Sequence, residues 1–364
     1  MTTRTTAPPT VTSAGPGVLE HVGPHWFTWV MGTGIVATAT VTLPTGALPV
    51  DPAAARAVAA GVWLLAAALL LAVTVASLAQ WLVHPLTARG HLDDPVTSHF
   101  YGAPAMALMT VGAGSLLVGT DLIGAGPALA LDAVLWSSGS ALGVWTLLTI
   151  PRRTWSGADR YDGPAFGGWL MPVVPPMVSA TTGALLVPHL APDHRDWMIG
   201  VCFALFVAAG VASAPLLAVV VGRTLRAHLG PATSVPTLFI VLGPVGQSVT
   251  AAHALGEQAG GPWRTVALAY GVPVLAAALV WLVVATVVTA RTARAGLPFA
   301  LTWWSFTFPL GTVVTGMSAV ATATGSLVLA HVAGALLIAL VTVWVVVAAR
   351  TATGLATGTL LGGR

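Results

Sequence analysis

The residues that could do chemistry inside the apolar segments of this chain are small and neutral. They are glycines, prolines and hydroxyl residues, at Gly32, Thr33, Gly34, Pro104, Pro175, Ser179, Thr181, Thr182, Gly243, Pro244, Gly246, Ser305, Pro309, Thr312 and Thr315. Hydroxyl groups donate hydrogen bonds, and interrupted helices expose N-terminal ends that carry partial positive charge. Because such groups hold a negative ion weakly, the pattern predicts a pore that small anions cross.

Groups able to catalyse a reaction or hold a metal are scarce in the same segments. Asp132 is the one acid within them, and His99, His253 and His331 lie on three separate segments without metal-ligand spacing. The single cysteine, Cys202, excludes a thiolate cluster or a disulfide framework, and no P-loop motif is present. We therefore expect no enzyme, no cofactor and no metal. The alternative from another class is a membrane enzyme or structural subunit acting on lipid.

Phe308 lies beside Pro309 on a stripe of hydroxyl residues. Helical spacing puts Ser305, Phe308, Thr312 and Thr315 on one face. A bulky ring in this position could plug a narrow conduit, whereas packing of the ring against a neighbouring helix is the alternative. The residues alone favour packing.

The composition indicates that these residues are carried by membrane helices. The chain is 56% hydrophobic and 7% charged, against roughly 25% charged residues in soluble domains. About 20 apolar residues are needed to cross a bilayer. Ten segments qualify, at 24–43, 57–83, 97–119, 128–150, 164–187, 197–222, 232–256, 265–290, 299–324 and 326–349. Residues 1–22 are predicted to be a disordered tail, 23–350 the transmembrane domain and 351–364 a second tail.

The interrupting residues recur at a nearly constant interval. Pro104, Pro175, Pro244 and Pro309 are separated by 71, 69 and 65 residues, and Gly32 with Gly34 holds the corresponding place in the first segment. Each interval accommodates two spans, so the odd-numbered span of each pair is expected to be broken or kinked. The sequence thus predicts an all-α polytopic membrane protein of ten transmembrane helices, arranged as five helical hairpins in a quasi-five-fold ring around a central pore.

Charge orients the chain in the membrane. All fourteen basic residues are arginine, and with ten spans both termini share one side. That side has eleven arginines, and the other side has Arg56, Arg195 and Arg264. The positive-inside rule therefore predicts cytoplasmic termini in the cell membrane and not a nucleic-acid surface. Arg223 and Arg226 are expected at the inner mouth, where they would raise the local anion concentration.

Four segments resemble the tellurite-resistance/dicarboxylate transporter family. They are HWFTWVMGTGI at 25–35, WLMPVVP at 169–175, LGPVGQS at 242–248 and WWSFTFPL at 303–310. That family includes tellurite-resistance permeases, sulfite efflux pumps, malic-acid permeases and plant slow anion channels. The segments are most similar to the sulfite and malate branches. The long soluble extensions of the plant channels are missing, and Asp94-Pro95 stands where many relatives have His-Pro.

The resemblance implies a pore lined by the odd-numbered helices, a homotrimer with one pore in each subunit, and Phe308 as the gate. It therefore reverses the preference for packing at Phe308. The expected cargo is sulfite or a C4-dicarboxylate such as malate, moved passively or with protons across the lipid bilayer. A gated chloride or nitrate channel and a tellurite-resistance permease are the alternatives.

Overall fold

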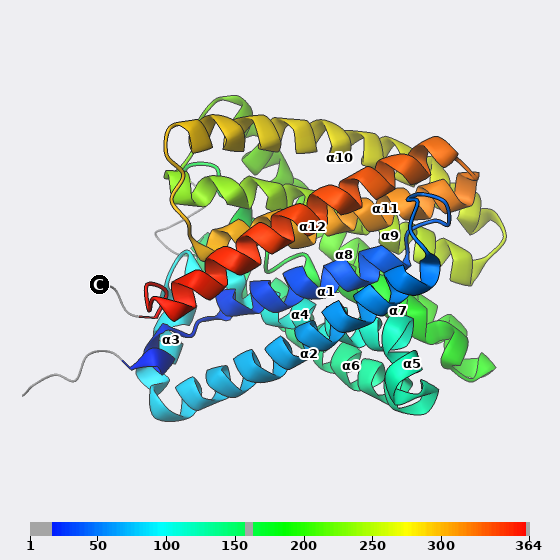
Figure 1. Ribbon diagram of the computed structural model, residues 1–364, viewed down its shortest axis with the longest axis horizontal. Coiled ribbons are helices and arrows are strands. Elements are labelled where there is room, and N and C mark those ends of the chain that lie inside the picture. The colour runs from blue at the N-terminus through cyan, green and yellow to red at the C-terminus, as the bar shows by residue number, and fades with distance from the viewer. Residues whose placement is uncertain (1–16, 157–162, 362–364) are drawn as a thin grey trace, which may run out of the picture.

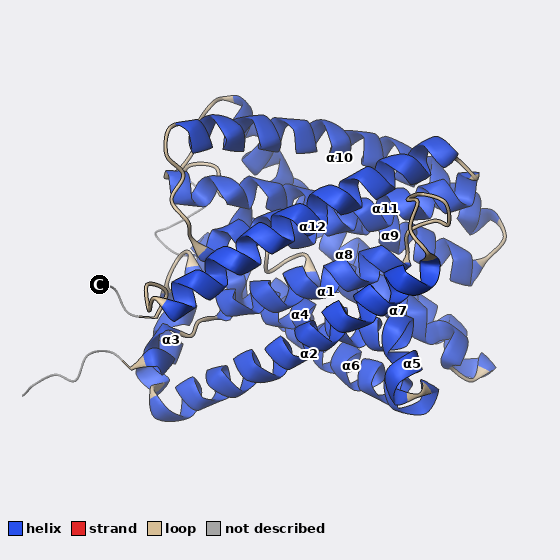
Figure 2. Ribbon diagram, viewed as in Figure 1, coloured by secondary structure: helices blue, strands red, loops and turns tan. Residues whose placement is uncertain are grey.

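A computed structural model describes residues 17–156 and 163–361 (Figure 1). Residues 1–16 and 362–364, which belong to the two predicted tails, and residues 157–162 lie outside this description. Throughout the described ranges the regular elements are helices, and no strand forms (Figure 2). The prediction of an all-α chain is confirmed.

Among the described residues, eight helical segments are long and apolar enough to cross a membrane. They contain α2 (Pro52–Val83), α4 (Gly102–Gly114), α6 (Ala125–Ser156), α8 (Pro192–Leu225), α9 (Leu242–Ala259), α10 (Pro262–Arg294), α11 (Thr307–Thr324) and α12 (Leu327–Ala356). The segment that contains α4 continues through a π-helical turn, η4 (Ser115–Gly119), into α5 (Thr120–Ile123). The helix α12 continues past the predicted start of the tail at residue 351.

The two remaining predicted spans form shorter helices. Residues 24–43 contain α1 (Phe27–Val41), and residues 164–187 contain α7 (Pro175–Leu186), with 15 and 12 residues respectively. At 1.5 Å per residue these helices measure about 22 Å and 18 Å, less than a hydrocarbon core of about 30 Å. Irregular and 3₁₀ backbone supplies the remaining length of each segment, because η2 (Pro24–Trp26) precedes α1 and η5 (Gly167–Leu170) precedes α7.

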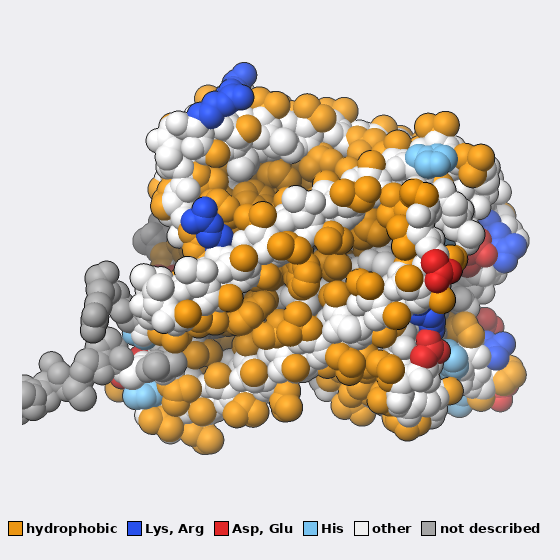
Figure 3. Space-filling view, in the orientation of Figure 1, with side chains coloured by type: hydrophobic (Ala, Val, Ile, Leu, Met, Phe, Trp, Pro, Cys, Tyr) orange, Lys and Arg blue, Asp and Glu red, His pale blue; other side chains and the backbone are white. Residues whose placement is uncertain are grey.

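The helices divide into an inner and an outer set. In the apolar windows of the segments that contain α9 and α11, 72% and 83% of residues are buried, against 28% for α10 and α12. In α1, 12 of the 15 residues are buried, and in α7, 10 of the 12. The inner helices contact one another in the cyclic order α1, α4, α7, α9, α11 and back to α1. Figure 3 shows a largely apolar surface over the middle of this face, which includes α12, with basic side chains toward its left and acidic and basic side chains toward its right edge.

Four of the five inner helices begin where a 3₁₀ segment becomes α-helical, and α7 follows its 3₁₀ segment after four residues of turn, 171–174. Besides η2 and η5, the 3₁₀ segments are η3 (Thr97–Tyr101) before α4, η7 (Ala232–Val241) before α9 and η8 (Leu301–Phe306) before α11. Pro175 is the first residue of α7, and Pro104, Pro244 and Pro309 are each the third residue of their helix.

These positions correct the expectation that the prolines break helices in mid-span. The first N–H groups of an α-helix have no partner within the helix, so a proline there removes no helical hydrogen bond. The helix α1 is also continuous through Gly32 and Gly34, and the predicted interruption there is wrong. Two short helices, α3 (Pro85–Asp93) and η6 (Val187–His189), and the turn η1 (Val18–His21) lie outside the inner set.

Candidate functional site

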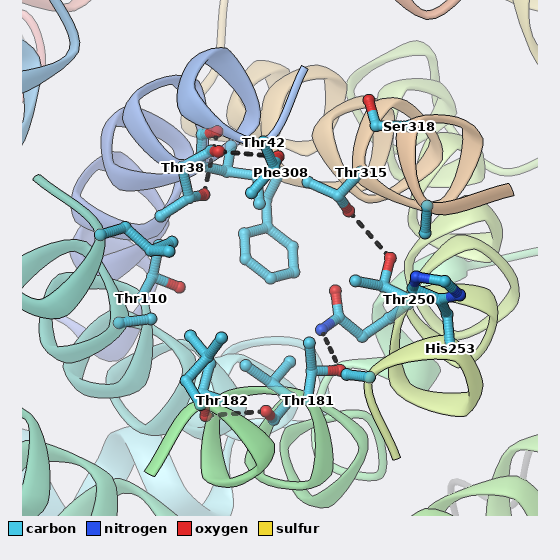
Figure 4. A pocket seen from close by; sticks show the side chains of 18 of the residues that line it. Thr38, Thr42, Thr110, Thr181, Thr182, Thr250, His253, Phe308, Thr315 and Ser318 are labelled. Atoms are coloured by element: carbon cyan, nitrogen blue, oxygen red, sulfur yellow. Dashed lines mark hydrogen bonds between the residues drawn. The ribbon is translucent and has the colours of Figure 1, made fainter. Parts of the chain in front are cut away.

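A cavity of about 320 Å³ lies between the five inner helices (Figure 4). Its polar lining residues lie mostly toward the C-terminal ends of these helices and are Thr38, Thr42, Thr110, Thr181, Thr182, Gln247, Thr250, His253, Thr315, Ser318 and Thr322. None of the described residues that line it is a lysine, an arginine or an acid. The cavity therefore offers uncharged polar groups set in apolar walls.

Phe308 separates this cavity from a second, much smaller void. The ring is 2% exposed and contributes to the lining of both spaces. The smaller void has about 10 Å³, close to the space of a single water molecule, and its lining includes Met31, Met106, Gly243, Ser305 and Pro309. Figure 4 shows the ring pointing toward the middle of the opening between the helices. The side chain thus lies at the narrow end of the cavity.

The cavity threonines offer hydrogen-bond acceptors to the cavity more than donors, because their own hydrogens bond to the backbone. Thr110 donates to Met106 O at 2.7 Å, and Thr182 donates to Val178 O at 2.9 Å. Thr315 donates to Thr312 O at 3.1 Å. A threonine within a helix commonly bonds the carbonyl three or four residues back, and its single hydrogen is then engaged. In this arrangement the hydroxyl hydrogens of these three threonines are engaged within their own helices, and the supply of donors to an anion by hydroxyl groups stays a prediction.

Gln247 supplies an amide donor at the cavity wall. Its Nε2 donates to Thr181 Oγ1 at 2.8 Å, and Thr181 donates its own hydrogen to Met177 O at 3.2 Å. Because the Thr181 oxygen must therefore accept, the orientation of the amide is determined by its partner. An amide nitrogen carries two hydrogens, so one remains for a further acceptor. Gln247 can offer this hydrogen to an anion in the cavity.

Several predicted pore residues instead hold the inner helices together. A Cβ atom on Gly32 would lie 2.3 Å from Thr307 Oγ1, and a Cβ atom on Gly246 would lie 2.7 Å from Thr312 Oγ1. A Cβ atom on Gly34 would lie 2.7 Å from Thr110 Cγ2. These glycines allow α1 and α9 to approach their neighbours closely, so they shape the cavity without lining it.

Other predicted residues also lie behind the wall. Thr33 Oγ1 accepts from Trp344 Nε1 at 3.1 Å, Thr312 donates to Leu242 O at 3.0 Å or Pro309 O at 2.7 Å, and Ser179 Oγ lies 3.0 Å from Met109 Sδ. Pro175 packs beside Gly143 of α6. Pro104 borders a separate pocket near α2, and Pro244 is buried. Of the predicted set, Thr181, Thr182, Phe308 and Thr315 line the main cavity, and Gly243, Ser305, Phe308 and Pro309 line the small void.

The sequence interpretation missed part of the site. Gln247 and Thr250 on α9, Thr38 on α1 and Thr110 on α4 line the cavity but lie outside the predicted set, and the sequence alone predicts no place in the wall for His253. The sequence could have indicated Gln247, because burying a glutamine amide inside an apolar span costs free energy unless the amide has a hydrogen-bond partner. The threonines carried little signal, because many threonines of these helices bond only to their own backbone.

The two arginines predicted at the inner mouth lie at the C-terminal end of α8, and Asp193 lies at its N-terminal end. Arg223 stacks over Trp169 of η5, with 5.2 Å from the guanidinium carbon to the ring centroid, and it also donates to Gly163 O. Arg226, the C-cap of α8, is exposed. The structure therefore brings Arg223 against an inner 3₁₀ segment and leaves Arg226 at the surface.

Asp94, which stands where a histidine was expected by resemblance, caps the segment before α4. Its Oδ1 accepts from Val96 N at 3.1 Å and from Thr97 N at 2.5 Å. Burial alone would raise the pKa of this carboxyl, but the hydrogen bonds from Thr97 and Val96 outweigh burial and hold its pKa below the ordinary value. The residue is therefore a charged cap that orders η3. Within the described ranges, no group of three or more histidine, cysteine or acidic side chains could hold a metal ion.

Comparison with known proteins finds relatives over most of the chain. Residues 21–352 match the SLAC1 family, described as voltage-dependent anion channel. An uncharacterized transporter of Methanocaldococcus jannaschii is 28% identical over 302 residues, covering 82% of this chain and 83% of the relative. The sulfite efflux pump SSU1 of Trichophyton rubrum is 25% identical over 322 residues, covering 82% of this chain and 81% of the pump. The predicted resemblance is confirmed, and the chain belongs to the voltage-dependent anion channel family, SLAC1, a family of membrane transporters and channels and not of enzymes.

Proposed function

We propose that this protein moves small anions across the cell membrane through the central cavity and that Phe308 is the gate. The observation that carries the proposal is the position of Phe308 between a cavity of about 320 Å³ and a void of about 10 Å³. A path along the inner helices would have to pass this ring. Movement of the ring would join the two spaces, and its present position closes them from each other.

The ten predicted spans, as five hairpins around this path, form the proposed architecture. The cyclic contacts of α1, α4, α7, α9 and α11 support it, because they leave a shared interior that the outer helices do not enter. Irregular backbone at membrane depth is tolerated where protein or a water-lined cavity satisfies it. The short helices α1 and α7 and the 3₁₀ segments are therefore compatible with spans that face an interior.

Sulfite or a C4-dicarboxylate such as malate is the proposed cargo. Similarity to the sulfite efflux pump of Trichophyton rubrum supports sulfite as the cargo. The amide of Gln247 in the cavity wall supports an anionic cargo, because it has one hydrogen left to donate. Both termini are proposed to be cytoplasmic, because eleven of the fourteen arginines lie on their side of the predicted topology. A homotrimer remains the expectation from the resemblance, as does a membrane domain that begins near residue 23.

A gated chloride or nitrate channel is the second candidate. The absence of a charged residue among those that line the cavity favours it, because weak binding suits rapid passage. Flux assays on purified protein in liposomes, comparing sulfite, malate, chloride and nitrate, separate the candidates. Saturable uptake of sulfite or malate with little chloride flux supports the carrier. Comparable flux of all four anions supports the channel, and no flux of any anion contradicts both.

A further inference from the structure

Asp132 is a buried carboxyl group that the proposed conduit does not use. It lies on α6, about 10 Å along the helix from its start at Ala125. The residue is 0% exposed, and among the described residues neither carboxyl oxygen has a hydrogen-bond partner. Isolated carboxylates are very costly in apolar surroundings and are favoured in the neutral form. In this arrangement the group is therefore suited to carry a proton.

The carboxyl group fits a space that Gly112 of α4 leaves open. A Cβ atom on Gly112 would lie 2.6 Å from Asp132 Oδ1, so any larger residue would displace the carboxyl. On the neighbouring turn, Ser115 Oγ lies within hydrogen-bond distance of Gly112 O, at 2.6 Å, and of Ala128 O on α6, at 2.8 Å. Asp132 thus lies directly in the contact between α4 and α6.

The same stretch of α4 leads to the cavity. Thr110 and Ala113, on either side of Gly112, line the cavity, and so does Leu117 in the π-helical turn η4. Single π-helical turns are frequent at functional sites. Gly114 and Gly119 are in close contact with Trp63 of α2, whose Nε1 donates to Val111 O at 2.9 Å. A shift of α4 away from α6 would therefore alter the cavity wall.

Few other titratable groups face Asp132. The elements α4, η4 and α7, which pack against α6, contain none. The short helix α5 contributes Asp121, which pairs with Arg56 of α2 and is exposed. His99 and Tyr101 in η3 lie at the opposite end of α4, and Cys202 of α8 lies beside Gly183 of α7, as does Trp136 of α6. A change of charge at this interface would thus come from Asp132 itself.

We propose that Asp132 is a proton-binding site whose occupancy controls anion passage, an inference that rests on the proposed function. With the proton bound, α4 packs against α6 and the conduit stays closed. When the carboxyl group loses its proton to water, a carboxylate ion is left in apolar surroundings. Because this ion must reach solvent, α4 separates from α6. By linkage, the closed form binds the proton more tightly, so raising the pH favours the open form.

Chloride flux in liposomes at matched inner and outer pH tests this proposal, because chloride does not titrate. For the wild type we expect flux to rise with pH, by up to about tenfold per pH unit for one linked proton. Asp132→Asn keeps the shape and cannot ionise, so its flux should stay low and independent of pH. Asp121→Asn removes an exposed acid from the neighbouring turn and should keep the wild-type profile.

Three results would overturn the proposal. They are a wild-type chloride flux that does not change with pH, an unchanged pH profile of flux in Asp132→Asn, or an equal loss of the pH dependence in Asp121→Asn. Asp132→Ala replaces the asparagine variant if that variant fails to fold. If no anion crosses at any pH, the proposed function fails, and melting temperature in detergent then tests the proton site separately. The wild type should lose thermal stability as the pH rises, whereas Asp132→Asn should not, and identical pH dependence of the two would reject the site.

Discussion

Gln247 on α9 and Thr181 on α7 are joined across the cavity wall by a hydrogen bond of 2.8 Å from Gln247 Nε2 to Thr181 Oγ1. The hydrogen of Thr181 is already given to Met177 O, so this bond positions the amide in one orientation. Most other hydroxyl groups of the cavity likewise bond to their own helices. Selectivity for an anion should therefore depend strongly on this amide.

Substitution of Gln247 should reduce anion flux. Gln247→Glu is expected to lower flux at least about tenfold, because like charges 4 Å apart repel by roughly 4 kcal/mol at an effective dielectric constant of 20. Gln247→Leu should cause a smaller decrease. Gln80→Leu is the matched control, since Gln80 is equally buried but bonds to Leu19 O outside the cavity. Flux in liposomes measures the effect, and unchanged flux in Gln247→Glu would exclude the amide from the path.

Shortening Phe308 should open the conduit. Phe308→Ala is expected to raise anion flux with little loss of thermal stability, because water can fill a space in a wet path. A phenylalanine that only packs between helices would instead lose about 3–5 kcal/mol of stability. Phe100→Ala, at a ring that is 4% exposed and outside the cavity lining, should show that loss without a gain in flux. A lower melting temperature with unchanged flux in Phe308→Ala would support the packing role.

Neutralising Arg226 should weaken flux in a salt-dependent way. Arg226 is exposed at the end of α8, so Arg226→Gln lowers the local anion concentration at the proposed inner mouth. The decrease should be largest at low salt and nearly vanish at 1 M, where the Debye length is about 3 Å. Arg195→Gln removes the same charge at the opposite end of α8 and controls for net charge. Equal salt dependence of the two variants would argue against steering by Arg226.

Residue 193 should be accessible from outside the cell. Asp193 is exposed at the start of α8, and Ala295 is exposed after α10 on the predicted cytoplasmic side. In a Cys202→Ala background, Asp193→Cys should react with an impermeant thiol reagent in intact cells. Ala295→Cys should react only after permeabilisation. The reverse pattern would mean that the predicted orientation is wrong.

A methyl group at Gly246 should destabilise the inner helices. Its Cβ atom would lie 2.7 Å from Thr312 Oγ1 and 2.9 Å from Val313 N, so backbone must move. Gly246→Ala is expected to cost about 1–3 kcal/mol and to lower the melting temperature. Gly61→Ala, where no atom lies within 4 Å, should instead stabilise α2 by up to about 1 kcal/mol. Equal melting temperatures would indicate that α9 and α11 separate easily.

The sequence alone was sufficient to predict the membrane helices and the family. Apolar runs of about 20 residues predict spans because lipid leaves the backbone no partner but itself. This reasoning located each end of α2, α6, α8, α10 and α12 to within seven residues. The repeat of prolines also marked the inner helices, but it did not show that Pro104, Pro244 and Pro309 lie in first turns. Hydropathy carries no information on where 3₁₀ backbone becomes α-helical.

The tertiary structure decided which polar groups face the cavity. Thr312 and Thr315 lie on one face of α11 in sequence, yet Thr312 bonds to Leu242 O and Thr315 lines the cavity. Likewise, the bond from Gln247 to Thr181 joins residues 66 positions apart, and Asp132 is buried because Gly112 of another helix leaves room for it. Periodicity places residues on a helix, whereas the packing of helices around one another determines what each face meets.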